Sequence, residues 1–171
     1  MNTVLIAALA GAASAVTGPF TIDPFHPKNF MSVEVAKAMV NQAANPVEPV
    51  GATGVVSWGT CQDDDNIFQF SQSMTSYSPS PIKLGSNLSL NLGGTCKVPM
   101  FVEKIHVHVD WNSVHLYDQD IAVGETFPTV LKESVSWFVP SYAPRGNYAV
   151  TLTGFDNASK TDICVTANFA L

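Results

Sequence analysis

The stretch Ile105-His-Val-His-Val-Asp110 decides the fold class, because apolar and polar residues alternate along it. A period of two places the apolar side chains on one face of a β-strand and the polar side chains on the other. Other segments share this alternation at fairly regular spacing, with almost no helical period: 68–74, 88–92, 114–116, 135–139, 148–153 and 163–169. About seven such segments predict an all-β fold, an immunoglobulin-like β-sandwich of two sheets.

Residues 1–15 have the features of a secretory signal peptide. An apolar run from Val4 to Ala10 precedes Ala13-Ser14-Ala15, a small-x-small site that a signal peptidase could cut. The run is too short to cross a hydrocarbon core of about 30 Å, and no later stretch is long and apolar enough. We therefore expect a mature chain without a transmembrane segment, either secreted or in the endolysosomal lumen.

Residues 16–55 form an N-terminal extension that is richer in proline than the rest of the chain. It contains one candidate helix, from Ser32 to Ala44, in which Ser32 can cap the first turn and Glu34 favours the positive end of the helix dipole. Few apolar residues anchor this helix, so we interpret 16–55 mainly as a linker or propeptide. The alternative is a helix that docks on the β-domain or covers an opening in it.

Charge and motif content exclude several classes of function. The net charge is −6 and no basic stripe is present, which argues against a nucleic-acid partner. The chain also lacks a nucleophile elbow, a phosphate-binding loop and a dinucleotide fingerprint. We therefore expect no enzymatic activity, no catalytic residues and no cofactor. The hydrophobic fraction of 46% points instead to an apolar interior larger than packing alone requires.

The alternating stretch places its two histidines on one face. His106, His108 and Asp110 share a face because their spacing is two, and a two-residue turn at Asn112-Ser113 would add His115. Three imidazoles and a carboxylate could hold zinc. This face is opposite the apolar residues, however. A solvated sheet surface offers few outer partners, the hydrogen-bonding groups behind the ligands that orient them toward the metal. We expect a polar, pH-responsive surface without a metal, and a zinc enzyme remains the less favoured alternative.

Three cysteines, Cys61, Cys96 and Cys164, are an odd number for a secreted chain. Cys96 follows Gly-Gly-Thr at the end of a predicted strand. The residues leave three states open for it: a half-buried free thiol, an intermolecular disulfide, or a bridge to Cys61.

Two sequons acquire meaning if the chain is secreted, because glycosylation occurs in the secretory pathway. They are Asn87-Leu-Ser89 and Asn157-Ala-Ser159. Asn157 lies in a turn-like segment and is the better expected acceptor.

The order of landmarks over residues 56–171 resembles that of the ML domain, the MD-2-related lipid-recognition family. The landmarks are Cys61, Ser78-Pro-Ser-Pro81 followed by Leu84-Gly85, Pro144-x-Gly146-x-Tyr148, and Cys164. The resemblance implies a disulfide between Cys61 and Cys164 that ties the first strand to the last. It also implies two sheets that enclose a lipid or sterol. The long extension before Cys61 departs from the family pattern.

Together, the resemblance and the strand alternation predict which residues form the wall and the rim of such a lipid cavity. The expected function is to bind a lipid or sterol between the sheets and to present or transfer it, with transient contact to a membrane or to a lipid-acceptor protein. The alternative is a ligand-free structural or adhesive β-domain outside the cell. The expected wall residues are Phe68, Phe70, Val107, Val109, Val150 and Phe169, and the expected rim residues are Trp137, Phe138 and Tyr148.

Overall fold

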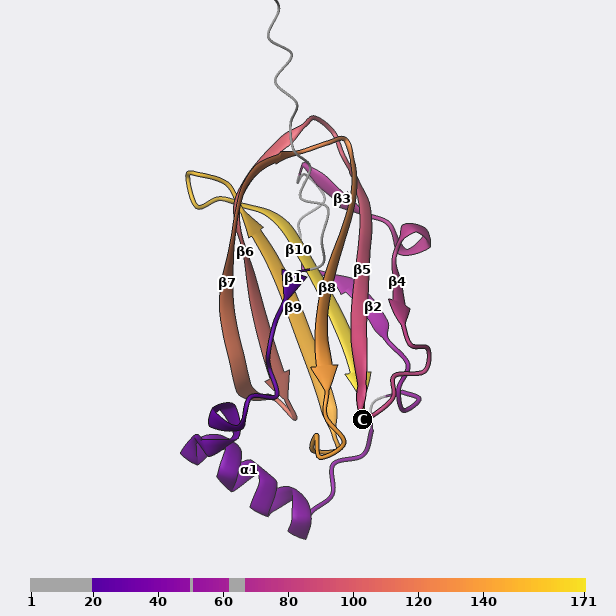
Figure 1. Ribbon diagram of the computed structural model, residues 1–171, viewed down its shortest axis with the longest axis vertical. Helices are drawn as coiled ribbons and strands as arrows, with labels where there is room; N and C mark the ends of the chain where they lie inside the picture. Colours follow the sequence, from indigo (N-terminus) through magenta and orange to yellow (C-terminus); the bar gives the residue numbers. More distant parts are fainter. Residues whose placement is uncertain (1–19, 50, 62–66) are drawn as a thin grey trace, which may run out of the picture.

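Two β-sheets face each other in the computed structural model, which describes residues 20–49, 51–61 and 67–171 (Figure 1). In the first sheet the strand order is β1–β8–β5–β3, and β4 also pairs with β5. The bounds of these strands are β1 Phe20–Thr21, β3 Phe68–Phe70, β4 Ser76–Ser78, β5 Ser86–Cys96 and β8 Val130–Val139. The pairing of β1 with β8 is parallel, and the other pairings of this sheet are antiparallel.

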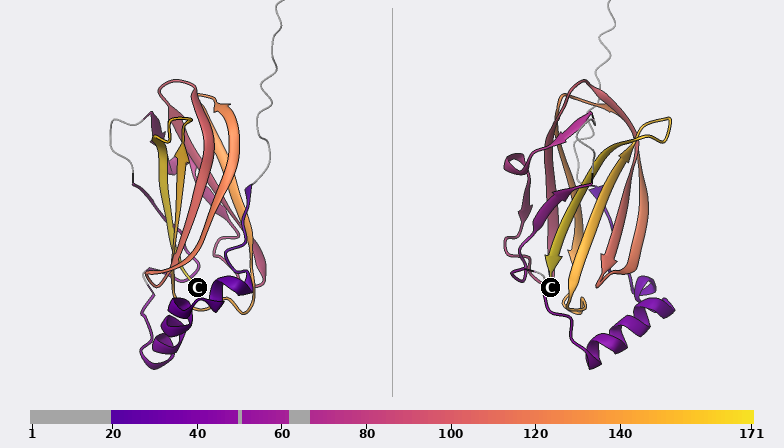
Figure 2. Two further views of the ribbon diagram at one scale, coloured as in Figure 1. Left: turned by 90° about the vertical axis from the view of Figure 1, so that its left-hand side faces the viewer. Right: turned by 180° about the vertical axis from the view of Figure 1, so that it is seen from behind.

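The second sheet is entirely antiparallel, with the strand order β2–β10–β9–β6–β7. Its strands are β2 Ser57–Thr60, β6 Met100–Trp111, β7 Val114–Phe127, β9 Asn147–Phe155 and β10 Thr161–Ala170. Figure 2 shows the strands of both sheets running along the long axis of the molecule, with the helical segment across one end.

The predicted all-β sandwich is confirmed, although the strand number differs from the prediction. Each of the seven alternating segments contributes to a strand, but the described residues form ten strands. The alternation did not indicate β1, β2 and β4, each of four residues or fewer, although the resemblance implied a first strand next to Cys61, where β2 lies. Strands this short contain too few repeats of the apolar–polar alternation to be recognised in the sequence.

The core lies between the sheets and is built from rows of apolar residues on neighbouring strands. In the second sheet Val107 pairs with Leu152, which pairs with Val165. The next row joins Val109, Val150 and Ala167. All six side chains are at most 2% exposed. This register explains the alternation in the sequence, because a slip of one residue would turn each apolar row toward solvent.

The turn predicted at Asn112-Ser113 joins β6 to β7. Both residues have positive φ, 50° and 64°, as a two-residue type I′ turn requires. Trp111 pairs with Val114 and Asp110 with His115. The turn therefore sets the pairing of the residues next to it, and an irregularity between Val109 and Asp110 shifts the register of the rest of β6 and β7, where His108 pairs with Asp118.

The predicted helix is present as α1, Val33–Ala44, preceded by a 3-10 turn, η1, Pro27–Met31. Ser32 is the N-cap, and its hydroxyl accepts a hydrogen bond from the backbone N–H of Val35 at 3.2 Å. The helical part of the extension lies across one end of the sandwich (Figure 1), where Val35 is fully buried and Phe25, just before η1, is 3% exposed, whereas β1 runs beside β8 in the first sheet. No helix within the described ranges has the length and apolar character needed to cross a bilayer.

Candidate functional site

Most residues predicted to wall a lipid site lie together between the sheets. Seven of the nine are buried, each at most 3% exposed. They belong to one apolar cluster, against which the half-buried Phe70 also packs. The seven are Phe68, Val107, Val109, Trp137, Tyr148, Val150 and Phe169.

Phe138 is the exception among the predicted rim residues. Its side chain is 54% exposed, whereas that of its neighbour Trp137 is 2% exposed. Adjacent residues of a strand point to opposite faces of the sheet, so the two rings cannot line the same space. The placement of Phe138 at the rim of an inter-sheet site is therefore wrong, and this ring belongs to the outer face of the first sheet.

An acidic side chain that the sequence reasoning missed shares the inner face of β8. Glu133 lies between the buried Leu131 and Val135 in the strand alternation, and it pairs with Leu92 of β5. Burial, with the negative charge of Glu125 adding to it, raises the pKa of Glu133 to about 7. The alternation of β8 could have revealed this carboxyl, because Glu133 has the same parity as Val135 and Trp137.

Two further polar groups of the inner face, the Tyr148 hydroxyl and the Trp137 indole N–H, differ in whether they have a hydrogen-bond partner. The hydroxyl of Tyr148 donates to the backbone carbonyl of Pro144 at 2.6 Å, and burial raises the pKa of this phenol. The indole Nε1–H of Trp137 is buried and has no hydrogen-bond acceptor among the described residues. A buried N–H without an acceptor is destabilising, so Trp137 presents an unused donor to the interior.

A pocket of about 360 Å³ lies at the end of the sandwich near the Asn112-Ser113 turn. Two predicted residues, Tyr148 and Phe169, line it, and their rings stack with centroids 5.4 Å apart. Val47 of the N-terminal extension contributes another part of the lining. The pocket thus lies where the extension meets the sandwich and touches only this end of the predicted wall.

The outer face of the second sheet carries a cluster of histidines and carboxylates. His106 and His108 on β6 share this face with Asp110, as the alternation indicates, and His115 joins them from β7. The structure adds two carboxylates that the sequence reasoning did not assign to the cluster. Asp118 pairs directly with His108 across the strands, and Asp120 pairs with His106.

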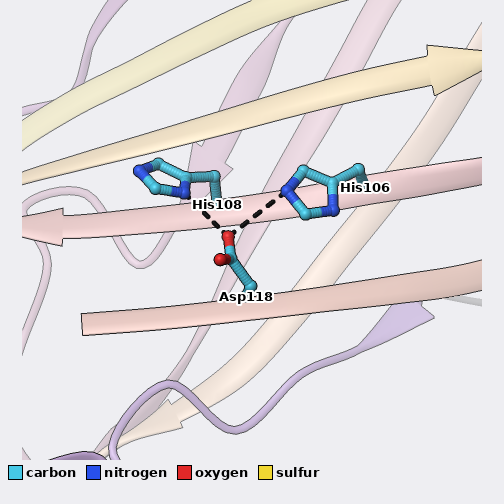
Figure 3. A group of neighbouring side chains, drawn as sticks. All are labelled: His106, His108 and Asp118. Carbon is cyan, nitrogen blue, oxygen red and sulfur yellow. Dashed lines mark hydrogen bonds and ion pairs between the residues drawn. The ribbon is translucent and has the colours of Figure 1, made fainter. Parts of the chain in front are cut away.

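Asp118 lies between two imidazole rings (Figure 3). Its Oδ1 is 2.7 Å from His108 Nδ1 and 3.2 Å from His106 Nε2, and its Oδ2 is 3.3 Å from His115 Nε2. The second nitrogen of each β6 histidine has a carboxylate of its own. His106 Nδ1 is 2.7 Å from Asp120 Oδ1, and His108 Nε2 is 3.0 Å from Asp110 Oδ1.

The ion pairs of this cluster shift the pKa values of two of its groups, His108 and Asp120. Partial burial lowers the pKa of His108, but the hydrogen bond to Asp118 and the charges of Asp110 and Asp118 outweigh it, so the pKa lies above its ordinary value. Hydrogen bonds from Lys104, at 2.7 Å, and from His106 hold the pKa of Asp120 below its ordinary value. The cluster therefore favours positive charge on His108 and negative charge on Asp120.

The disulfide implied by the resemblance is present between Cys61 and Cys164, whose Cα atoms are 5.1 Å apart. Cys96 is a buried free thiol. Burial, with the charge of Asp162 adding to it, raises the pKa of Cys96. Of the three states that the sequence left open for Cys96, the structure has the free thiol.

Both sequon asparagines have exposed side chains. Asn87 lies on the outer face of β5, and Asn157 lies in the turn between β9 and β10. Burial therefore does not hinder access of a glycosyltransferase to either asparagine. The predicted signal peptide, 1–15, lies outside the described residues.

Comparison with known proteins gives distant structural similarity only. No protein-family model matches the chain, and no curated protein matches it in sequence. A Niemann-Pick type C2 protein from the Japanese carpenter ant is 13% identical, with a TM-score of 0.47, over 67% of this chain and 98% of that protein. Chicken MD-1 complexed with lipid IVa is 10% identical, with a TM-score of 0.37, over 66% of this chain and 95% of that protein.

A third similar structure is an AA10 lytic polysaccharide monooxygenase from Streptomyces lividans. It is 11% identical, with a TM-score of 0.37, over 54% of this chain and 63% of that protein. At such identities and TM-scores none of the three similarities decides what this chain binds.

Proposed function

We propose that this protein binds a lipid or sterol between its two sheets and presents or transfers it. The observation that carries the proposal is the unused indole N–H of Trp137, which is buried among the mostly apolar side chains between the sheets. A ligand oxygen placed there would accept the hydrogen bond that the described residues do not accept. The ordered landmarks that resemble the ML domain support the same function.

The driving force for binding would be the removal of apolar ligand surface from water. Each buried methylene contributes about 0.8 kcal/mol, so a long acyl chain or a sterol ring system needs no charged anchor. The predicted wall residues Val107, Val109 and Val150 are aliphatic and buried, and therefore match such a ligand in chemistry. Because they already pack in one core, we infer that the sheets separate as the ligand enters.

The polar end of the ligand would be recognised by hydrogen bonding to Trp137. A neutral hydrogen bond contributes about 1 kcal/mol net, and an unsatisfied buried donor costs about 1–3 kcal/mol. A ligand with a hydroxyl or carbonyl oxygen would therefore bind more tightly than a hydrocarbon of the same length. Sterols and other lipids with a hydroxyl or ester group carry such an oxygen.

We also propose that the protein works outside the cytosol. The disulfide between Cys61 and Cys164 supports an oxidising compartment. The exposed sequons at Asn87 and Asn157 and the predicted signal peptide fit the same route. A secreted protein or a protein of the endolysosomal lumen would meet lipid at membrane surfaces, where it could take up or release its ligand.

Solvent extraction of the purified protein followed by mass spectrometry tests the proposal directly. We expect about one apolar molecule per chain, or uptake of one from vesicles that contain phosphatidylcholine and cholesterol. Trp137→Phe removes the N–H and keeps an aromatic ring, and it should weaken binding of a long-chain alcohol about fivefold to tenfold. Binding of the alkane of equal length should change less.

Phe138→Leu provides the matched control, because it alters the exposed neighbour on the opposite face of β8. We expect no change in lipid uptake for this variant. An extract free of lipid, together with no uptake from vesicles, would contradict the proposal. The better account would then be a ligand-free structural or adhesive domain.

A further inference from the structure

We propose that His106, His108 and Asp118 form a binding site for one divalent transition-metal ion of the zinc class on the outer face of the second sheet. The proposal is independent of lipid binding, since these side chains lie on the face opposite the buried Val107 and Val109. One ligand atom from each of the three residues lies within 4.8 Å of the other two.

The two distances from Asp118 to the imidazole nitrogens are close to those around a tetrahedral ion. Ligands bound to zinc at about 2.0–2.1 Å in a tetrahedron are about 3.3 Å from one another. Asp118 Oδ1 is already 2.7 Å from His108 Nδ1 and 3.2 Å from His106 Nε2, and Figure 3 shows it between the two rings. Small rotations of these partly exposed side chains would place all three atoms on one ion, which leaves the fourth position for water.

Each histidine has the outer partner that metal-binding imidazoles normally require. A ligating imidazole usually donates its other N–H to a carboxylate, which fixes the ring and raises its basicity. His106 Nδ1 has Asp120 at 2.7 Å, and His108 Nε2 has Asp110 at 3.0 Å. Lys104 in turn holds Asp120 at 2.7 Å.

These outer partners change the expectation formed from the sequence. The solvated sheet face was expected to lack them, and for that reason no metal was expected. The missing information was the register of β7, which places Asp118 opposite His108 and Asp120 opposite His106. Residues directly opposite on antiparallel strands are about 5 Å apart at Cβ, so the sheet itself holds ligand and outer partner together.

Local charge favours a divalent cation at this position. The cluster contains three carboxylates, Asp110, Asp118 and Asp120, and one permanently charged cation, Lys104. With the imidazoles neutral, as metal binding requires, two negative charges remain. A dication at Asp118 would balance them. His115 Nε2 contacts the other oxygen of Asp118 at 3.3 Å and can hold that carboxylate in place.

Calorimetric titration of the full chain with zinc chloride, with magnesium chloride as the comparison, tests this site. We expect one zinc ion per chain and no magnesium binding, since imidazole nitrogens favour zinc. His106→Ala and Asp118→Asn should each weaken zinc binding more than 100-fold. Asp120→Asn alters only an outer partner and should weaken it about 10-fold to 100-fold.

His26→Ala is the matched control, because His26 is the one histidine of the chain outside the cluster. It should leave zinc affinity unchanged, and circular dichroism should show that all four variants keep the sheet structure. Zinc binding that survives His106→Ala or Asp118→Asn would overturn the proposal. So would the absence of zinc binding by the unaltered protein, or an Asp120→Asn variant with unchanged affinity.

Discussion

Cys61 and Cys164, which are 103 positions apart in the sequence, are joined by a disulfide that ties the end of edge strand β2 to β10. Two hydrogen bonds accompany it. The backbone N–H of Cys61 donates to the carbonyl of Cys164 at 3.2 Å, and the hydroxyl of Thr60 donates to the same carbonyl at 3.0 Å. The short strand β2 has only four paired positions, so this covalent link is an important part of its attachment to the sheet.

Replacing both Cys61 and Cys164 by serine should therefore destabilise the fold. Closing a loop of this length reduces the entropy of the unfolded chain and contributes about 4–5 kcal/mol in the chain-entropy model. The free energy of unfolding in urea, compared between the double variant and the unaltered protein, measures the loss. A loss below about 1 kcal/mol would mean that the link adds little to the pairing of β2 with β10.

Cys96 should be unreactive in the folded protein. Its side chain is 5% exposed, and its raised pKa keeps the thiol protonated at neutral pH. We expect almost no reaction with a disulfide reagent such as DTNB under native conditions and one equivalent after denaturation without reductant. Immediate reaction in the native state would contradict this burial, and two or more equivalents after denaturation would contradict the bond between Cys61 and Cys164.

Phe25 should hold the N-terminal extension on the end of the sandwich. Its ring lies 5.7 Å from that of Tyr148 and 6.3 Å from that of Phe30, measured between centroids. Phe25→Ala should remove up to about 3–5 kcal/mol of docking free energy. Hydrogen exchange in α1 should then accelerate, whereas Val40→Ala, at a position 71% exposed, should leave it unchanged. Equal exchange rates in both variants would show that Phe25 does not anchor the extension.

The sequence was sufficient to predict the sandwich because the period of two survives in every long strand. It also assigned the faces of Val107, Val109 and Val150 correctly, since burial follows the alternation. Phe138 was misplaced because grouping it with Trp137 ignored that same alternation. In both cases the face of a side chain follows from its odd or even position within one strand, which can be read from the sequence alone.

The histidine cluster shows what parity alone does not reveal. Alternation placed His106 and His108 on one outer face, but the partners across the sheet depend on the register of β7. That register includes an irregularity between Val109 and Asp110, which local sequence does not reveal. Asp118 and Asp120 were therefore not assigned to the cluster from the sequence, and their role as partners of the histidines emerged from the strand pairing.

Glu133 should make stability depend on pH between about 4.5 and 7. Its pKa rises from an ordinary value of 4.5 to about 7 in the folded protein, so the folded state binds more protons than the unfolded state in this range. The free energy of unfolding should fall as the pH rises through this window, because ionisation places a carboxylate on the inner face of β8. Below pH 4.5 the carboxyl is protonated in both states, and the penalty disappears.

Glu133→Gln should remove this contribution and make the protein more stable than the unaltered chain at pH 8. The slope of the difference should stay well below about 1.4 kcal/mol per pH unit, because the half-exposed carboxyl is partly screened by solvent. Urea unfolding of ligand-free protein at pH 5 and pH 8 measures it, and taking the difference between variants cancels the titration of the histidine cluster. Glu103→Gln, at an exposed position of β6, is the control and should change neither value. A Glu133→Gln variant with the same pH dependence as the unaltered chain would place the carboxyl in water rather than between the sheets.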